Sequence, residues 1–166
     1  MDAFTLVHVA LSLVGILSGL VVLFGLIGGK RLNGWTAVFL VTTIATSVTG
    51  FFFPFHGVTP GIVIGILSII ILAVAVVARY TRQMAGGWRK TYVITSAIAL
   101  YFNVFVLVVQ LFRRVPVLKE LAPTQSEPPF VVTQLVVMVA FIALTVLAVK
   151  NFRVAEPAAR VRTVSA

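Results

Sequence analysis

The sequence predicts an all-α integral membrane protein, and two observations carry this prediction. Of the 166 residues, 60% are hydrophobic and only 10% are charged, against about 45–50% and 25% in an ordinary soluble domain. The mean hydropathy is +1.14. So few charges cannot cover the surface of a water-soluble particle of this size, and we therefore expect the surrounding solvent to be lipid.

Five apolar runs are long enough to cross a bilayer, whose hydrocarbon core requires about 20 residues of helix. They cover residues 4–27, 35–55, 62–78, 91–112 and 130–149 and predict one transmembrane helical domain over residues 1–153. The first run has no basic segment before it and no signal-peptidase site after it, so we expect it to be retained. Residues 154–166 are predicted to form a disordered, basic cytoplasmic tail.

Two connections have distinct compositions. The second and third runs are separated by a few residues between Pro54 and Pro60, so we expect these helices to form an antiparallel hairpin. The longer connection, residues 115–129, holds four prolines and two glutamates. Its last two residues, Pro128 and Pro129, suit the first turn of the following helix.

The basic residues predict the orientation of the bundle. With the N-terminus outside, the inner connections and tail carry ten Lys and Arg residues, and the outer connections carry three. This asymmetry predicts an N-out, C-in topology, in which Arg113 and Arg114 extend from a helix end on the less basic side. The net charge is +9. Because the charges lie between apolar runs, we expect them to face anionic lipid head groups and not nucleic acid.

Several classes of function are disfavoured by what the sequence lacks. It contains no cysteine, so disulfides, thiolate metal sites and thiol catalysis are excluded. No Asp, Glu, Lys or Arg lies in the central part of a predicted span, which removes the usual carriers of proton relays and ion-coupled transport. Phosphate-binding glycine loops and the common hydrolase motifs are missing too. We therefore expect a non-catalytic protein.

Polar side chains predicted near the outer ends of the spans form the candidate ligand site. These residues are His8, Thr46, Thr49, His56, Gln110 and Gln134. Polar groups in a membrane mark functional sites by default, so one hypothesis is an outer cleft for a small solute or a lipophilic ligand. Separately from such a cleft, we expect Gln110 and Gln134 to meet near the outer leaflet and to hold two helices together.

The two histidines leave a second alternative open, a redox protein with haem or a metal ion. Two imidazoles can ligate haem iron, or can bind zinc or copper together with a carboxylate. The carboxylates available near the outer ends are Asp2, Glu120 and Glu127. Apart from this alternative, we expect no cofactor.

A second set of residues is predicted to pack helices together. It comprises Ser12, Gly15, Gly19, Gly61, Gly65 and Asn103. Small residues at this spacing let helix backbones approach closely, and an amide in lipid requires a partner. We expect Asn103 to reach a threonine or a carbonyl of another helix. The interfacial anchors are predicted to be Phe51–Phe53 and Phe55 on the outer side, and Trp35, Tyr80, Trp88 and Tyr92 on the inner side.

Three stretches carry a resemblance to other proteins: ATSVTGFFFPFHG at residues 45–57, LYFNVFVLVVQLF at 100–112 and LAPTQSEPPF at 121–130. They resemble segments of small, uncharacterised bacterial inner-membrane proteins. The resemblance implies a multi-pass protein of the bacterial inner membrane, and it implies no activity, ligand or site residue.

The leading functional hypothesis is an accessory, assembly or scaffolding component of a membrane complex, or a homo-oligomer. Its expected partners are the lipid bilayer and either other membrane subunits or further copies of the chain. The small-residue faces, the polar interhelical side chains and the lack of charge inside the predicted spans motivate it.

Overall fold

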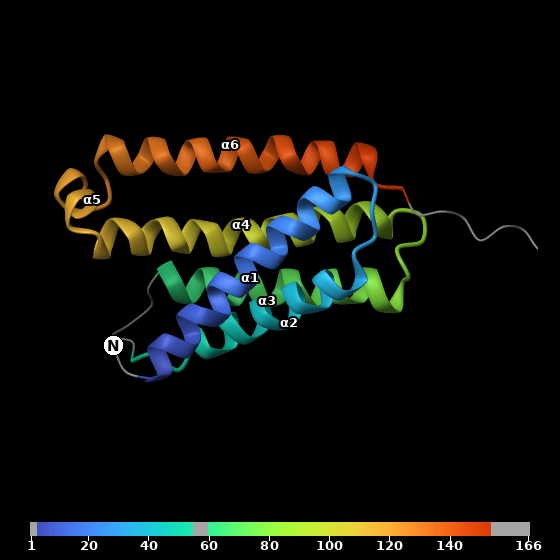
Figure 1. Cartoon of the computed structure of the whole chain (residues 1–166), viewed down its shortest axis with the longest axis horizontal. Helices are drawn as coiled ribbons and strands as arrows, with labels where there is room; N and C mark the ends of the chain where they lie inside the picture. Colours follow the sequence, from blue (N-terminus) through green and yellow to red (C-terminus); the bar gives the residue numbers. More distant parts are fainter. Residues whose placement is uncertain (1–2, 55–59, 154–166) are drawn as a thin grey trace, which may run out of the picture.

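The structure, a computed structural model, describes residues 3–54 and 60–153 and contains helices but no strand within those ranges. The helices are α1 (Ala3–Ile27), α2 (Asn33–Gly50), α3 (Pro60–Val76), η1 (Val77–Thr81), α4 (Trp88–Arg114), α5 (Pro116–Leu121) and α6 (Pro128–Asn151) (Figure 1). The predicted all-α class is confirmed. His56, Asp2 and residues 154–166 lie outside the described residues.

Four helical segments are long and apolar enough to span a membrane by their length and composition: Ala3–Ile27, Gly61–Thr81, Trp88–Arg114 and Pro128–Asn151. They indicate a membrane protein. The predicted fifth span corresponds to α2, which has 18 residues and is about 27 Å long. This helix is rich in threonine and is not one of the four.

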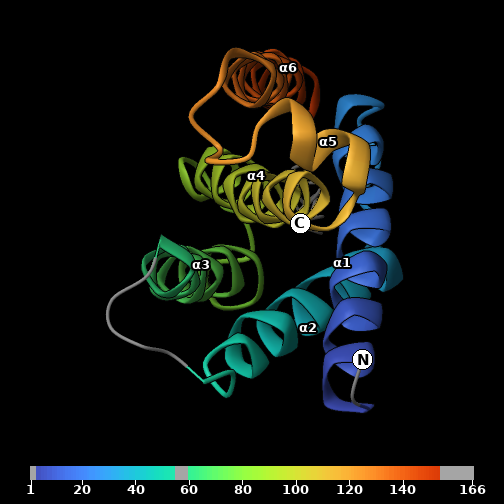
Figure 2. The same cartoon turned by 90° about the vertical axis from the view of Figure 1, so that its left-hand side faces the viewer.

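The helices form a bundle with α4 at its centre. Helix α1 packs against α2, α4 and α6, and α4 also contacts α3 and α6. Viewed along the bundle, α6, α4 and α3 are stacked, and α1 and α2 lie beside this stack (Figure 2). Helices α2 and α3 run in opposite directions and contact each other, as expected for a hairpin (Figure 1).

The main buried cluster joins all five of the long helices, α1, α2, α3, α4 and α6. Its largest fully buried members include Phe39 of α2, Leu72 of α3, and Tyr92 and Leu100 of α4, and Leu23 of α1 packs in the same cluster. Lipid tails are as apolar as these side chains, so the hydrophobic effect does not drive helices together in a membrane. Close van der Waals packing contributes the stabilisation instead.

Several helix ends differ from the predicted ones, and α2 differs most. It ends at Gly50 and not at residue 55. Pro54 explains this difference, because a proline ring clashes with the carbonyl four residues earlier in a helix, which here is that of Gly50. The predicted third span, residues 62–78, continues instead through the π-helical turn η1 to Thr81. The predicted spans 91–112 and 130–149 lie within α4 and α6.

The connection between α4 and α6 contains the short helix α5 and is folded onto α4. Helix α5 begins at Pro116, and Ala122 after it is 1% exposed. The Gln125 side-chain Nε2 donates a hydrogen bond to the Val109 carbonyl at 3.0 Å. Helix α6 begins at Pro128, as the sequence predicts.

Glu127 holds the turn before α6. Its carboxylate accepts hydrogen bonds from the Thr124 backbone N–H at 3.1 Å, the Thr124 hydroxyl at 2.8 Å and the Ser126 backbone N–H at 3.1 Å. Desolvation raises the pKa of Glu127, but these hydrogen bonds favour the charged carboxylate and outweigh it. Its pKa therefore lies below the ordinary value.

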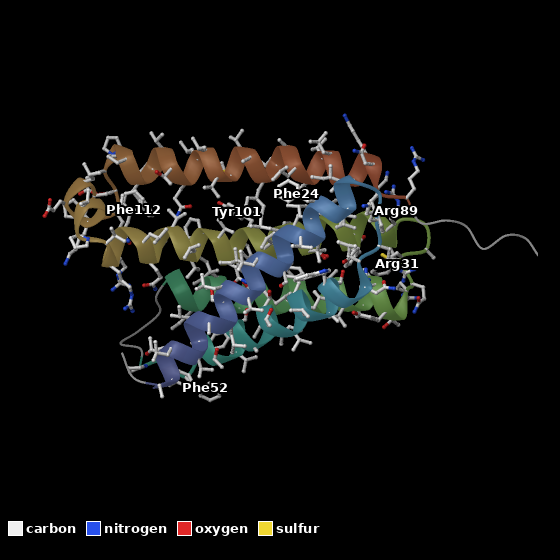
Figure 3. All side chains as sticks on the ribbon, in the orientation of Figure 1. Phe24, Arg31, Phe52, Arg89, Tyr101 and Phe112 are labelled. Atoms are coloured by element: carbon white, nitrogen blue, oxygen red, sulfur yellow. The ribbon has the colours of Figure 1, made fainter. Side chains whose placement is uncertain are left out.

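The two ends of the bundle differ in charge. At one end α1, η1 and α6 finish and α2 and α4 begin (Figure 1). We call this the basic end, because its described residues include eight cations and no acid: Lys30, Arg31, Arg79, Arg82, Arg89, Lys90, Lys150 and Arg153. Figure 3 shows Arg31 and Arg89 at this end and Phe52 and Phe112 at the opposite end.

Candidate functional site

His8 and Thr49 are the two predicted site residues that the structure joins. The His8 Nδ1 lies 2.8 Å from the Thr49 hydroxyl oxygen, which links α1 to α2. The Thr49 hydroxyl also lies 2.7 Å from the Ala45 carbonyl, to which it donates its proton. A hydroxyl has one proton, so while that proton is donated to Ala45 the His8–Thr49 bond requires the Nδ1–H tautomer of His8 as the donor. In a neutral imidazole the Nε2 then carries the free lone pair.

The surroundings of this pair are aromatic. The Phe53 ring meets the His8 ring edge to face, with the ring centroids 5.0 Å apart, and the Phe4 and Phe53 centroids are also 5.0 Å apart. Such a setting holds the imidazole in one orientation. The available chemistry is acceptance of a hydrogen bond, or coordination of a metal ion, at Nε2.

The other predicted site residues have separate environments. The buried Thr46 hydroxyl has no hydrogen-bond partner. The Gln134 Nε2 donates to the Phe105 carbonyl at 3.2 Å, and the Gln110 Oε1 accepts from the Arg114 Nε at 3.2 Å. The predicted contact between Gln110 and Gln134 is therefore wrong. Arg114 lies one helical turn beyond Gln110, and its charged donor binds the amide oxygen more strongly than a second amide would.

Neither of two hollows among the described residues is lined by a residue of the candidate ligand site. One hollow lies among α1, α2 and α4, beside Gly19 and Ser96, and has no room for a water molecule. An open furrow on α6 is lined by Leu135, Val136, Val139 and Ala140. Among the described residues, no three His, Asp or Glu side chains gather into a metal-binding group.

Asn103 forms a polar contact in the middle of the bundle. Its Nδ2 donates to the hydroxyl oxygen of Thr43 on α2 at 3.4 Å, a partner of the kind the sequence predicts. Gly15 of α1 faces the same point, since a Cβ atom on Gly15 would lie 3.1 Å from the Thr43 Oγ1 and 3.6 Å from the Asn103 Nδ2. Three helices therefore meet around these polar atoms.

The remaining predicted packing residues behave differently from one another. A Cβ atom on Gly19 would lie 2.6 Å from a Leu100 methyl carbon, so only glycine allows this close approach of α1 to α4. A Cβ atom on Gly65 would lie 3.0 Å from the Phe51 ring. Gly61 is exposed and Ser12 is half-buried.

A buried arginine at the basic end was not predicted. Arg79 of η1 is 2% exposed, although its position just after the third apolar run predicts a loop charge. Its Nη2 donates to the Asn33 Oδ1 at 2.7 Å, and its guanidinium carbon lies 5.0 Å from the centroid of the Tyr92 ring. Tyr92, in turn, has its hydroxyl 3.4 Å from the Thr36 hydroxyl. The predicted role of Tyr92 as an interfacial anchor is wrong, because its side chain is fully buried.

The position of the next helix-breaking residue in the sequence indicates that Arg79 lies in a helix and not in a loop. After Ala78 the sequence contains no glycine or proline until Gly86, so the third helix has no local reason to end before Arg79. The chain turns only at Gln83 and Met84, whose φ angles are 49° and 57°.

A second arginine at this end binds the end of α6. Arg89 of α4 donates through Nη1 to the Val149 carbonyl at 3.0 Å and to the Phe152 carbonyl. These carbonyls lie in and just after the last turn of α6, where no further turn of helix supplies donors. Asn151 adds a link to α1, because its Nδ2 donates to the Ile27 carbonyl at 3.1 Å. The ends of α1 and α6 and the start of α4 are thereby joined.

No protein-family model, curated protein or solved structure matches the chain.

Proposed function

We propose that the chain is a non-catalytic membrane protein that crosses the bilayer five times, with α2 as the fifth span. Two features support this count. Threonine hydroxyls of α2 donate hydrogen bonds to carbonyls of their own helix. Thr42 donates to the Val38 carbonyl at 2.7 Å, and Thr49 donates to the Ala45 carbonyl at 2.7 Å. Such bonds lower the cost of placing hydroxyls in lipid. Five crossings also place the two ends of the described chain on opposite sides of the bundle, as its helix order requires.

The orientation proposed here is N-out and C-in, in a bacterial inner membrane. Its support is the charge difference between the two ends: the basic end has eight cations, and the opposite end has three, Arg113, Arg114 and Lys119, with Glu120 and Glu127 beside them. Excess Lys and Arg mark the cytoplasmic side of a multi-pass protein. Labelling of single cysteines tests this, because the native sequence has none. Ala3→Cys should react with an impermeant maleimide on intact cells, and Lys150→Cys should not.

Within the membrane, the proposed role is an accessory, assembly or scaffolding component of a larger complex, or a homo-oligomer. One observation carries it. Of the 24 residues of α6, the structure buries only Gln134, Phe141 and Ala148. A span with so little contact inside its own bundle offers most of its surface to lipid or to another membrane subunit, and small specific contacts suffice for association in lipid.

The test is native mass spectrometry of the protein extracted from its own membranes in mild detergent. A second polypeptide or a second copy of the chain is the expected result. A lone monomer at native expression levels would contradict the proposal. Cysteine cross-linking locates the contact: Val136→Cys on α6, 63% exposed, should form cross-links, whereas the matched variant Leu17→Cys on α1, 64% exposed, should not.

A second candidate function is binding of a small solute or lipophilic ligand. The observation that favours it is the free Nε2 lone pair of His8 implied by the bond to Thr49. The same mass spectra test this function, because a small added mass that His8→Ala removes would support it. An unchanged mass in both proteins would exclude a ligand that survives extraction.

A further inference from the structure

The basic end carries exposed cations that form no side-chain hydrogen bond or ion pair among the described residues. Its exposed cations are Lys30, Arg31, Arg82, Lys90, Lys150 and Arg153. Only Arg82 has a described side-chain contact, with its guanidinium carbon 5.3 Å from the centroid of the Trp88 ring. The others have no hydrogen bond or ion pair through their side chains among the described residues. Their charge is therefore free to act on a partner.

One described cation of this end, Arg79, is buried, and it adds to the positive potential of the exposed cations. Arg79 is 2% exposed, and its guanidinium binds the Asn33 amide oxygen and lies near the Tyr80 and Tyr92 rings. No described carboxylate lies at the basic end to neutralise it. A charge enclosed by protein is screened less by salt than an exposed one, so Arg79 strengthens the positive potential beneath the exposed cations.

Aromatic side chains set the depth at which these cations lie. Trp35, Tyr80 and Trp88 are 51%, 48% and 37% exposed and belong to three separate elements at the basic end. Exposed Trp and Tyr side chains prefer the head-group level of a bilayer, where an apolar ring meets a polar surface. Cations beside them are therefore placed among the phosphates of the lipid head groups.

The opposite end provides an internal contrast. Its described cations are Arg113, Arg114 and Lys119, and Glu120 and Glu127 lie in the same connection. Arg114 also donates to the Gln110 side chain. Acids and an internal hydrogen bond reduce the attraction of this end for an anion.

We infer that the basic end selectively binds the head groups of anionic phospholipids, in preference to zwitterionic ones. The inference depends on the proposed membrane location and adds the class of lipid that the protein retains. The recognising chemistry is a net negative phosphodiester facing several cations from different loops. Each Lys or Arg near such a surface contributes about a fivefold preference.

The experiment reconstitutes the full-length chain in vesicles of equal phosphatidylglycerol and phosphatidylcholine, extracts it in mild detergent and measures the lipids that remain bound. The variant is K30Q/R31Q/K90Q, which neutralises three exposed cations at the basic end. The matched control is R113Q/R114Q/K119Q, which neutralises three exposed cations at the opposite end. The conservative variant K30R/K90R keeps the charge.

The wild-type protein, the control and K30R/K90R should retain the anionic lipid with an enrichment of about fivefold or more, and K30Q/R31Q/K90Q should approach equal retention. Equal retention by the wild-type protein, or equal losses in the two triple variants, would overturn the inference. Displacement of the lipid by inorganic phosphate at constant ionic strength would also overturn it, because the site would then bind free phosphate.

This design separates the inference from the proposal on which it depends. Both leaflets of the vesicles have the same composition, so the orientation of the protein does not affect the lipids it meets. A chain that fails to enter the vesicles contradicts the membrane proposal. A chain that enters them and retains both lipids equally contradicts only the inference about lipid class.

Discussion

Replacement of Gly19 by alanine tests the packing of the bundle centre. A Cβ atom at this position would lie 2.6 Å from the Leu100 Cδ1 and 2.8 Å from two carbons of the Phe39 ring. Carbon atoms in contact are normally about 3.5–4.0 Å apart. The added methyl group would therefore lie about 1 Å too close both to Phe39 of α2 and to Leu100 of α4.

The neighbours of Gly19 have little space in which to withdraw. Phe39 and Leu100 are each 1% exposed, and the hollow beside them has no room for a water molecule. Overpacking of this kind costs about 1–3 kcal/mol. The higher helix propensity of alanine offsets up to about 1 kcal/mol of this cost, so a control with the same chemical change is required.

Gly34→Ala is that control, because a Cβ atom on Gly34 would have nothing within 4 Å. Thermal unfolding in detergent, followed by tryptophan fluorescence, compares the two variants. At about 2–4 °C per kcal/mol for a chain of this size, the Tm of Gly19→Ala should lie about 2–12 °C below that of Gly34→Ala. Equal Tm values for the two variants would refute the proposed close approach of α1 to α2 and α4.

Three further predictions concern polar contacts. Thr49→Val removes the hydroxyl that binds His8 and should lower the free energy of unfolding by about 1 kcal/mol, measured as a lower Tm. The control is Thr42→Val, because the Thr42 hydroxyl donates to carbonyls of its own helix. An equal loss in this control would contradict the prediction. Arg89→Gln removes the cation at the end of α6 and should accelerate hydrogen exchange there, while uniform exchange along α6 would argue against a local role. The lowered pKa of Glu127 means that its carboxylate contributes stability above its ordinary pKa and loses this contribution as the pH falls through the lowered value. The Tm difference between the wild-type protein and Glu127→Gln should therefore shrink from about pH 7 to about pH 3, and a constant difference would be inconsistent with these hydrogen bonds.

The sequence by itself determined the class of the fold and the places where several helices begin. Apolar composition and the lengths of the apolar runs identify the helices, because a segment in lipid must satisfy its backbone hydrogen bonds internally and a helix does so within the segment itself. Pro128 marks the start of α6 for a similar reason, since its fixed φ suits a first helical turn and its missing N–H is not needed there. The predicted end of α2 at residue 55 is wrong, and the structure places it at Gly50, where a local clash with the Pro54 ring explains it.

The partners of polar side chains were predicted only in part. Asn103 has a threonine partner, as an amide in an apolar helix must find some acceptor. Gln110 and Gln134 are predicted to lie at a similar depth, but they form no bond with each other, because Gln110 binds Arg114 and Gln134 binds the Phe105 carbonyl. Depth along a helix follows from residue number, whereas contact also depends on the direction in which each side chain points.

Only the tertiary structure decided which side chains are enclosed. Arg79 and Tyr92 are charged or polar residues near helix ends, and the sequence places both at the membrane surface; the structure buries them against each other and Asn33. The physical reason is rotation. Each residue turns the side-chain direction by about 100° around the helix axis, so burial depends on how far each helix is rotated and how the helices cross. Hydropathy determines that these helices form, and the packing of α1, α2 and α4 determines which of their faces meet.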